Sequence, residues 1–133
     1  MSTLAQVMRK QLKTIGHGAS IKEAASRMRD ERIGALLVEK SGSYVGIVTD
    51  TDVVRRAVAQ GLDIGNTHVD TIMTSPIATI DVLRTLQDAH DMMGDLSVRH
   101  LGVTEQGKLT GIISVRDLLV YFKRVSEPKI AQD

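Results

Sequence analysis

The chain has 133 residues, a formal net charge of +1, 42% hydrophobic and 25% charged residues, and only 2% aromatic residues. This composition is typical of an ordinary soluble globular protein and argues against wholesale disorder and fibrous repeats. The 17 basic and 16 acidic side chains are interspersed, so no basic stripe for nucleic acid is predicted, and the lack of cysteine excludes disulfides and thiol nucleophiles.

Hydrophobic periodicity and turn residues predict the secondary structure of the chain. Ser20, followed three residues later by Glu23, has the spacing of a helix-capping box, and Gly42 can supply the positive φ of a hairpin turn. Each half therefore has the order strand, helix, strand, strand, helix. After the first strand, the predicted elements are a helix over 20–31, strands over 35–38 and 44–48, a helix over 50–60 that ends at Gly61, a helix over 82–93 that ends at Gly94, strands over 98–103 and 109–113, and a helix over 115–124.

The two halves align without a gap at an offset of 65 positions, as Asp52 and Asp117 illustrate. The identical pairs include Met8/Met73, Thr14/Thr79, Ala24/Ala89, Met28/Met93, Leu36/Leu101, Val38/Val103, Gly46/Gly111 and Ile47/Ile112. The chain is therefore a tandem repeat of an α/β unit, with repeat 1 over 1–61, a linker over 62–71, repeat 2 over 72–125 and a tail over 126–133. Because a half of about 60 residues buries little surface alone, we expect the repeats to pack with pseudo-twofold symmetry.

The doubled motif carries a family resemblance. Gly46 to Asp52 (GIVTDTD) and Gly111 to Asp117 (GIISVRD) share a glycine-apolar-apolar-Thr/Ser-x-x-Asp pattern that resembles the motif of the CBS (cystathionine-β-synthase) domain. The whole chain resembles a tandem CBS pair, or Bateman module. The resemblance implies ligand sensing: such pairs bind adenosine-containing ligands (AMP, ADP, ATP, S-adenosylmethionine, sometimes NAD) in clefts between the repeats.

The resemblance also implies site residues. Asp117 and Asp52 would accept hydrogen bonds from ribose hydroxyls, and Ser114 or Thr49 with the following helix amides would meet a phosphate. Adenine would be held by the other repeat. The residues implied are Thr14, Ile33, Gly34 and Ala35 for the Asp117 site and Thr79, Val98, Arg99 and His100 for the Asp52 site, with Arg32, Arg99, His100 and Arg116 as phosphate candidates.

Both motifs also have the spacing of plain helix-capping boxes, which need no ligand. If ligand does bind, the two sites should differ. Asp50 adds a second carboxylate beside Asp52, whereas Asp117 has Arg116 as its neighbour, so an anion meets less repulsion at the second motif. A magnesium ion on Asp50 would invert this ranking.

No enzyme activity is expected, because the chain has no nucleophile elbow and no histidine pair with metal-ligand spacing. A nucleotide hydrolase is disfavoured for lack of a general base beside a glycine-rich loop. With no signal peptide and no run of about 18 apolar residues, the expected location is the cytoplasm, without membrane or nucleic-acid partners.

The predicted function is a regulatory module that acts in trans on an effector protein. Apolar positions on the helices over 50–60 and 115–124 exceed what each repeat needs for its own core, which predicts a homodimer. The alternative is a structural dimerisation adaptor that binds no ligand.

Overall fold

The computed structural model describes residues 3–126 and divides them into two compact units. One, the repeat 1 unit, spans Leu12–Ile77. The other, the repeat 2 unit, combines the residues up to Gln11 with those from Ala78 onward. The units therefore do not follow chain order, because the N-terminal segment belongs with the second repeat.

The repeat 1 unit is a three-stranded sheet of order β1-β2-β3 with its helices. Strand β1 pairs parallel to β2, and β2 pairs antiparallel to β3. The elements are β1 (Thr14–Gly16), α2 (Ile21–Glu31), β2 (Ala35–Lys40), β3 (Ser43–Thr49), α3 (Asp50–Asp52), the π-helix η1 (Val53–Val58) and the 3-10 helix η2 (Val69–Thr71). The predicted element order is confirmed, and the tight turn has Gly42 at a φ of 79°.

The repeat 2 unit has the same topology, with the sheet order β4-β5-β6. Its elements are α1 (Leu4–Val7), β4 (Thr79–Asp81), α4 (Leu86–Leu96), β5 (His100–Glu105), β6 (Lys108–Ser114) and α5 (Val115–Ser126). The predicted α/β class with two similar repeats is confirmed, while their pseudo-twofold packing stays a prediction. Apart from Ser126, which ends α5, the predicted tail lies outside the described residues.

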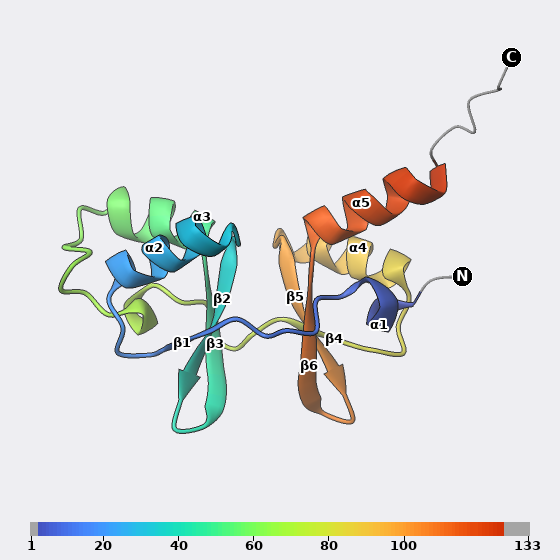
Figure 1. Ribbon diagram of the computed structural model, residues 1–133, viewed down its shortest axis with the longest axis horizontal. Helices are drawn as coiled ribbons and strands as arrows, with labels where there is room; N and C mark the ends of the chain where they lie inside the picture. The colour runs from blue at the N-terminus through green and yellow to red at the C-terminus, as the bar shows by residue number, and fades with distance from the viewer. Residues whose placement is uncertain (1–2, 127–133) are drawn as a thin grey trace, which may run out of the picture. The chain divides into compact units, whose positions relative to one another are not determined.

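Each repeat contributes its leading segment to the unit of the other repeat. Leu4 is fully buried in the core of the repeat 2 unit, and the Arg9 amide donates to the Ile112 carbonyl of β6 at 2.7 Å. In Figure 1, α1 lies beside β6 and the red helix α5. Correspondingly, Val69 is buried in the core of the repeat 1 unit, where the Thr74 amide donates to the Ile47 carbonyl of β3 at 2.8 Å. The linker predicted over 62–71 therefore contributes a residue, Val69, to the hydrophobic core of the repeat 1 unit.

The helix predicted over 82–93 was wrong at both ends. Helix α4 begins at Leu86 because the Thr85 hydroxyl accepts from the Asp88 amide at 2.9 Å and the Asp88 carboxylate accepts from the Thr85 amide at 3.1 Å. The latter bond holds the pKa of Asp88 below its ordinary value, so this contribution is present above the ordinary pKa and is lost as the pH falls through the lowered one. The helix continues through Gly94 to Leu96.

Gly94 therefore lies inside a helix, where glycine is a poor helix former. A Cβ built at this position meets nothing within 4 Å, and the backbone φ is not positive. We expect Gly94→Ala to raise the free energy of unfolding by about 0.5–1 kcal/mol, measured by urea denaturation. An alanine at Gly61, whose φ is 71°, should instead destabilise the protein, and equal effects at the two positions would contradict this explanation.

The second helix of repeat 1 differs from a plain α-helix. After one turn of α3 it widens into the π-helix η1, in which the Ala59 amide donates to the Val54 carbonyl five residues back. Ala57 is fully buried, whereas Val54 and Val58 are 60% and 62% exposed. Helix α5 likewise buries Leu118 and leaves Leu119 63% exposed. The apolar excess expected on these helices is present on their surfaces.

Candidate functional site

The first candidate site lies where β3 passes into α3. The Thr49 hydroxyl accepts from the Asp52 amide at 3.2 Å, and Oδ2 of Asp52 accepts from the Thr49 amide at 3.0 Å. Ser114 and Asp117 repeat this geometry between β6 and α5, at 3.1 and 2.9 Å. Both motifs are therefore genuine capping boxes, and any ligand must bind side chains that already cap a helix.

The two motifs differ in how many amides they leave for an anion. In α3, the Asp50 amide donates to the Gly34 carbonyl at 3.0 Å and the Thr51 amide to the Asp50 carboxylate at 2.8 Å. In α5, the Val115 amide donates to the Arg99 carbonyl at 2.8 Å. The Arg116 amide lies in the first turn of α5, where an amide has no acceptor within the helix, and no residue among 3–126 outside the helix accepts from it. Only the second motif keeps a first-turn amide available for a phosphate.

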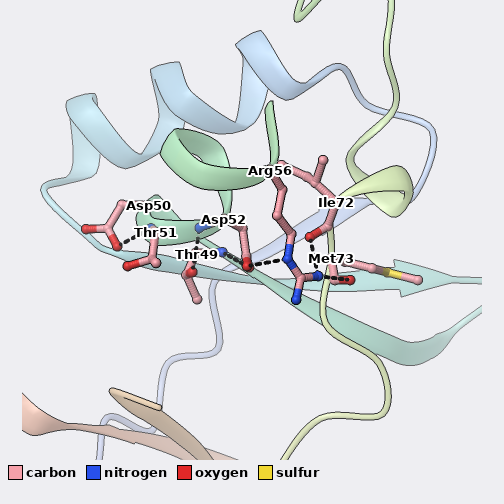
Figure 2. A network of polar contacts seen from close by, with 7 residues as sticks. All are labelled: Thr49, Asp50, Thr51, Asp52, Arg56, Ile72 and Met73. Carbon is pink, nitrogen blue, oxygen red and sulfur yellow. Dashed lines mark hydrogen bonds and ion pairs between the residues drawn. The ribbon is translucent and has the colours of Figure 1, made fainter. Parts of the chain in front are cut away.

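Arg56 distinguishes the first motif further, as Figure 2 shows. Its Nε lies 3.6 Å from Oδ1 of Asp52, whose side chain is 11% exposed. Its Nη1 donates to the carbonyls of Ile72 and Met73 at 3.3 and 3.4 Å. Arg56 thus joins the buried carboxylate to the segment that leads into repeat 2. The sequence prediction missed this residue, although its spacing of four from Asp52 on one helix was a usable signal.

The second motif has no such cation, because Tyr121 occupies the position equivalent to Arg56. Oδ2 of Asp117 accepts from Ser114, and Oδ1 has no hydrogen bond or ion pair to any residue in the described part of the chain. Arg116, which directly precedes Asp117, is exposed. This carboxylate oxygen is the acceptor best placed to meet an added hydroxyl group.

The other predicted residues lie at neighbouring strand ends within their own units. Ala35 is opposite Thr49 in the β2-β3 register, and His100 is opposite Ser114 in the β5-β6 register. Each motif is thus flanked by the segment entering the middle strand of its own sheet. Thr14 and Thr79 begin the edge strands, Ile33, Gly34, Val98 and Arg99 precede the middle strands, and Arg32 ends α2 in the left-handed conformation.

Ile33 and Val98 pack against the cores of their own units, a structural role that requires no ligand. The combination of Asp117 with Thr14, Ile33, Gly34 and Ala35 joins residues of two units and stays a prediction, as does that of Asp52 with Thr79, Val98, Arg99 and His100.

No group of three or more histidine, aspartate or glutamate side chains in residues 3–126 has an arrangement that could hold a metal ion. None of the helices described is long and apolar enough to cross a membrane.

The two three-stranded units, each with a Thr/Ser-x-x-Asp cap after its hairpin, form a tandem repeat of one fold, and known proteins share this fold. The CBS domain pattern matches residues 4–59 and 69–124, so the chain belongs to the CBS domain family. It is 34% identical over 120 residues to the CBS domain-containing protein YhcV of Bacillus subtilis, covering 90% of this chain and 85% of that one.

Solved structures give the same result. A putative signal-transduction protein with CBS domains from Burkholderia ambifaria superposes with a TM-score of 0.87 at 30% identity, covering 96% of both chains. A hexameric CBS-CP12 protein from bloom-forming cyanobacteria superposes with a TM-score of 0.84 at 27% identity, covering 97% of this chain and 76% of that one.

Proposed function

We propose that this protein is a non-catalytic regulatory module of the cytoplasm that binds an adenosine-containing ligand, AMP, ADP, ATP or S-adenosylmethionine, and acts in trans on an effector protein. The observation that carries the proposal is the Ser114/Asp117 motif, in which one carboxylate oxygen and the Arg116 amide remain available beside a satisfied cap. A ribose diol can donate to the carboxylate, and a phosphate can accept from the amide at the positive end of α5.

The structural adaptor remains the second candidate, because both capping boxes are complete without a ligand. A thermal-shift panel of AMP, ADP, ATP, S-adenosylmethionine and NAD, with and without magnesium, separates the two. A ligand at about one hundred times its dissociation constant should stabilise the protein by about 2.7 kcal/mol, a readable rise in Tm. Guanosine nucleotides are the control. If no adenosine compound shifts Tm, the adaptor is the better description.

The ligand should be bound without being consumed, since the described residues place no general base beside a glycine-rich loop that could hold the phosphates for transfer. Chromatography of ATP incubated with the protein should show no product above the buffer blank. Turnover that is abolished by Asp52→Ala or Asp117→Ala would contradict the non-catalytic function.

We further propose that the module is a homodimer formed through η1 and α5, because Val54, Val58 and Leu119 expose apolar surface on these helices. Light scattering at tens of micromolar should give a dimer mass, and Val54→Glu or Leu119→Glu should give a monomer. Leu83→Glu is the matched control, since Leu83 is 90% exposed but lies on neither helix. A monomeric wild type, or a dimer that survives both substitutions, would contradict the arrangement.

A further inference from the structure

The repeat 2 unit has a groove between the edge strand β4 and helix α4. Its volume is about 500 Å³, within the range of small-ligand pockets. The apolar part of its lining is Ala78, Met92 and Leu96. Leu96, the last residue of α4, is 52% exposed, whereas Leu86 and Met93 of the same helix are buried. This groove is separate from the Ser114/Asp117 motif, none of whose residues lines it.

In repeat 1, charged side chains occupy the positions equivalent to the apolar lining of this groove. At the offset of 65, Ala78, Met92 and Leu96 correspond to Lys13, Arg27 and Glu31. Lys13 Nζ lies 2.9 Å from Glu31 Oε1, and Arg27 Nε lies 2.7 Å from Glu31 Oε2. These two cations hold the pKa of Glu31 below its ordinary value. All three charged residues are replaced by apolar ones in repeat 2.

Arg27 also hydrogen bonds to the edge strand. Its Nη1 donates to the Thr14 carbonyl of β1 at 2.7 Å. The equivalent carbonyl in repeat 2 belongs to Thr79 of β4, which lines the groove. The Ala78 carbonyl accepts from the Gly102 amide of β5, so the alternation of a strand directs the Thr79 carbonyl to the open edge. No side chain in residues 3–126 donates to it.

The charged side chains that line the groove are mostly acidic, which favours binding of a cation. Asp88, Asp91 and Asp95 line it from α4, against the single cation Arg84, which lies 3.2 Å from Asp88. Oδ1 of Asp91 accepts from Gln87 and lies 3.2 Å from His90 Nδ1. Asp95 has no ion pair or hydrogen-bond partner for its side chain in the described part of the chain. Asp91 and Asp95 are therefore the carboxylates that can meet an incoming cation.

We infer that this groove is a docking site for an arginine side chain carried by an extended segment of a partner protein. The guanidinium would take the place that Arg27 has in repeat 1, donating to the Thr79 carbonyl and pairing with Asp91 or Asp95, while its methylene groups contact Met92 and Leu96. A planar guanidinium can donate to a carbonyl and a carboxylate at once, which a lysine ammonium matches less well.

A peptide segment is favoured over free arginine because the volume exceeds what one side chain fills and because β4 is an open strand edge. An extended segment can add backbone hydrogen bonds along such an edge, while its side chains fill the neighbouring groove. The inference rests on the Thr79 carbonyl and on α4 and does not need the adenosine ligand, although Thr79 is also one of the residues implied for the Asp52 site.

The test uses the full chain, labelled with nitrogen-15, and the probe acetyl-Val-Arg-Val-amide. We expect the probe to shift the amide resonances of β4 and α4. Replacing the arginine of the probe by citrulline, which keeps the shape and removes the charge, should weaken binding roughly tenfold or more. Binding equal for both peptides, or no shift at millimolar peptide, would overturn the inference.

Variants locate the site. Met92→Arg should abolish binding, because the new arginine would stand at the position equivalent to Arg27 and take the place of the incoming guanidinium. The double variant Asp91→Asn with Asp95→Asn, at exposed positions that do not contribute to the core, should weaken binding roughly tenfold. Asp30→Asn, at the position equivalent to Asp95 in repeat 1, is the matched control and should leave binding unchanged. Binding that survives Met92→Arg in a folded protein would contradict the site.

Two further measurements distinguish other occupants. Free arginine should bind much more weakly than the peptide, and equal affinity would indicate a small-molecule site instead of a docking surface. Light scattering of the Asp91→Asn/Asp95→Asn variant should give the wild-type mass. Loss of a dimer in this variant would show that the occupant is a second copy of the chain, which overturns the assignment to a partner protein.

Discussion

Gly46→Ala should lower the free energy of unfolding by about 1–3 kcal/mol. A Cβ at Gly46 would lie 2.6 Å from Met73 Sδ and 2.8 Å from the Thr74 carbonyl oxygen. Met73 is a flexible side chain, but the Thr74 carbonyl is fixed by its hydrogen bond from the Ile47 amide at 2.9 Å. The added methyl group therefore pushes against backbone that cannot move without losing contacts between β3 and the segment after η2.

The second repeat provides the comparison. The three atoms nearest to a Cβ at Gly111 all belong to the side chain of Met8, which can change rotamer, so Gly111→Ala should cost less than Gly46→Ala. Gly16→Ala is the control, since nothing lies within 4 Å of a Cβ there. Urea denaturation with a common m-value measures all three. If Gly46→Ala is no more destabilising than Gly16→Ala, the close approach of the two segments is not rigid.

Asp117→Asn should reduce the affinity for an adenine nucleotide by roughly tenfold or more, about 1.5–3 kcal/mol, because ribose hydroxyls would lose a charged acceptor. Asp52→Asn should have a smaller effect in EDTA. Both oxygens of Asp52 already face donors, the Thr49 amide and Arg56, and Asp50 adds repulsion for a phosphate. Calorimetric titration of AMP into wild type and both variants measures the difference.

Asp88→Asn is a matched control for the capping role, because Thr85 and Asp88 form the same box on α4 away from both motifs. It should change the stability and leave the affinity unchanged. If Asp52→Asn loses the tighter site and Asp117→Asn does not, the charge argument is wrong. Arg56 would then be the cation that decides which site is stronger, and Arg56→Ala, with Arg55→Ala as control, would show it.

The sequence predicted the repeated topology well, because repeated turns and caps are local signals. Helix α2, both hairpins and α5 lie close to their predicted ranges, and the two motifs occupy the predicted helix starts. The start of α4 was predicted wrongly at 82, although the repeat offset of 65 places the equivalent of the capping residue Ser20 at Thr85. The residues after Asp81 form a turn before the helix, in which the Asp81 carboxylate accepts from the Leu83 amide at 2.9 Å.

Other features depend on tertiary contacts that no local pattern contains. The bonds from Arg56 to the Ile72 and Met73 carbonyls join residues 16 and 17 positions apart. The groove of repeat 2 is visible only when its lining is compared in space with the Arg27 contacts of repeat 1. The sequence motif alone also cannot predict that one oxygen of Asp117 lacks a partner, because Asp52 has the same motif and its second oxygen lies near Arg56.

The exchange of leading segments between the two units has a consequence for how such a chain could have arisen. Leu4 and Arg9 complete the sheet and core that follow in repeat 2, while Val69 and Thr74 complete those of repeat 1. An ancestral chain of half this length would therefore have lacked a part that a second copy could supply, by the same exchange between molecules. Duplication and fusion would have turned that obligate pair into one gene. Afterwards the halves could diverge, as the different residues at the Arg27 and Met92 positions illustrate.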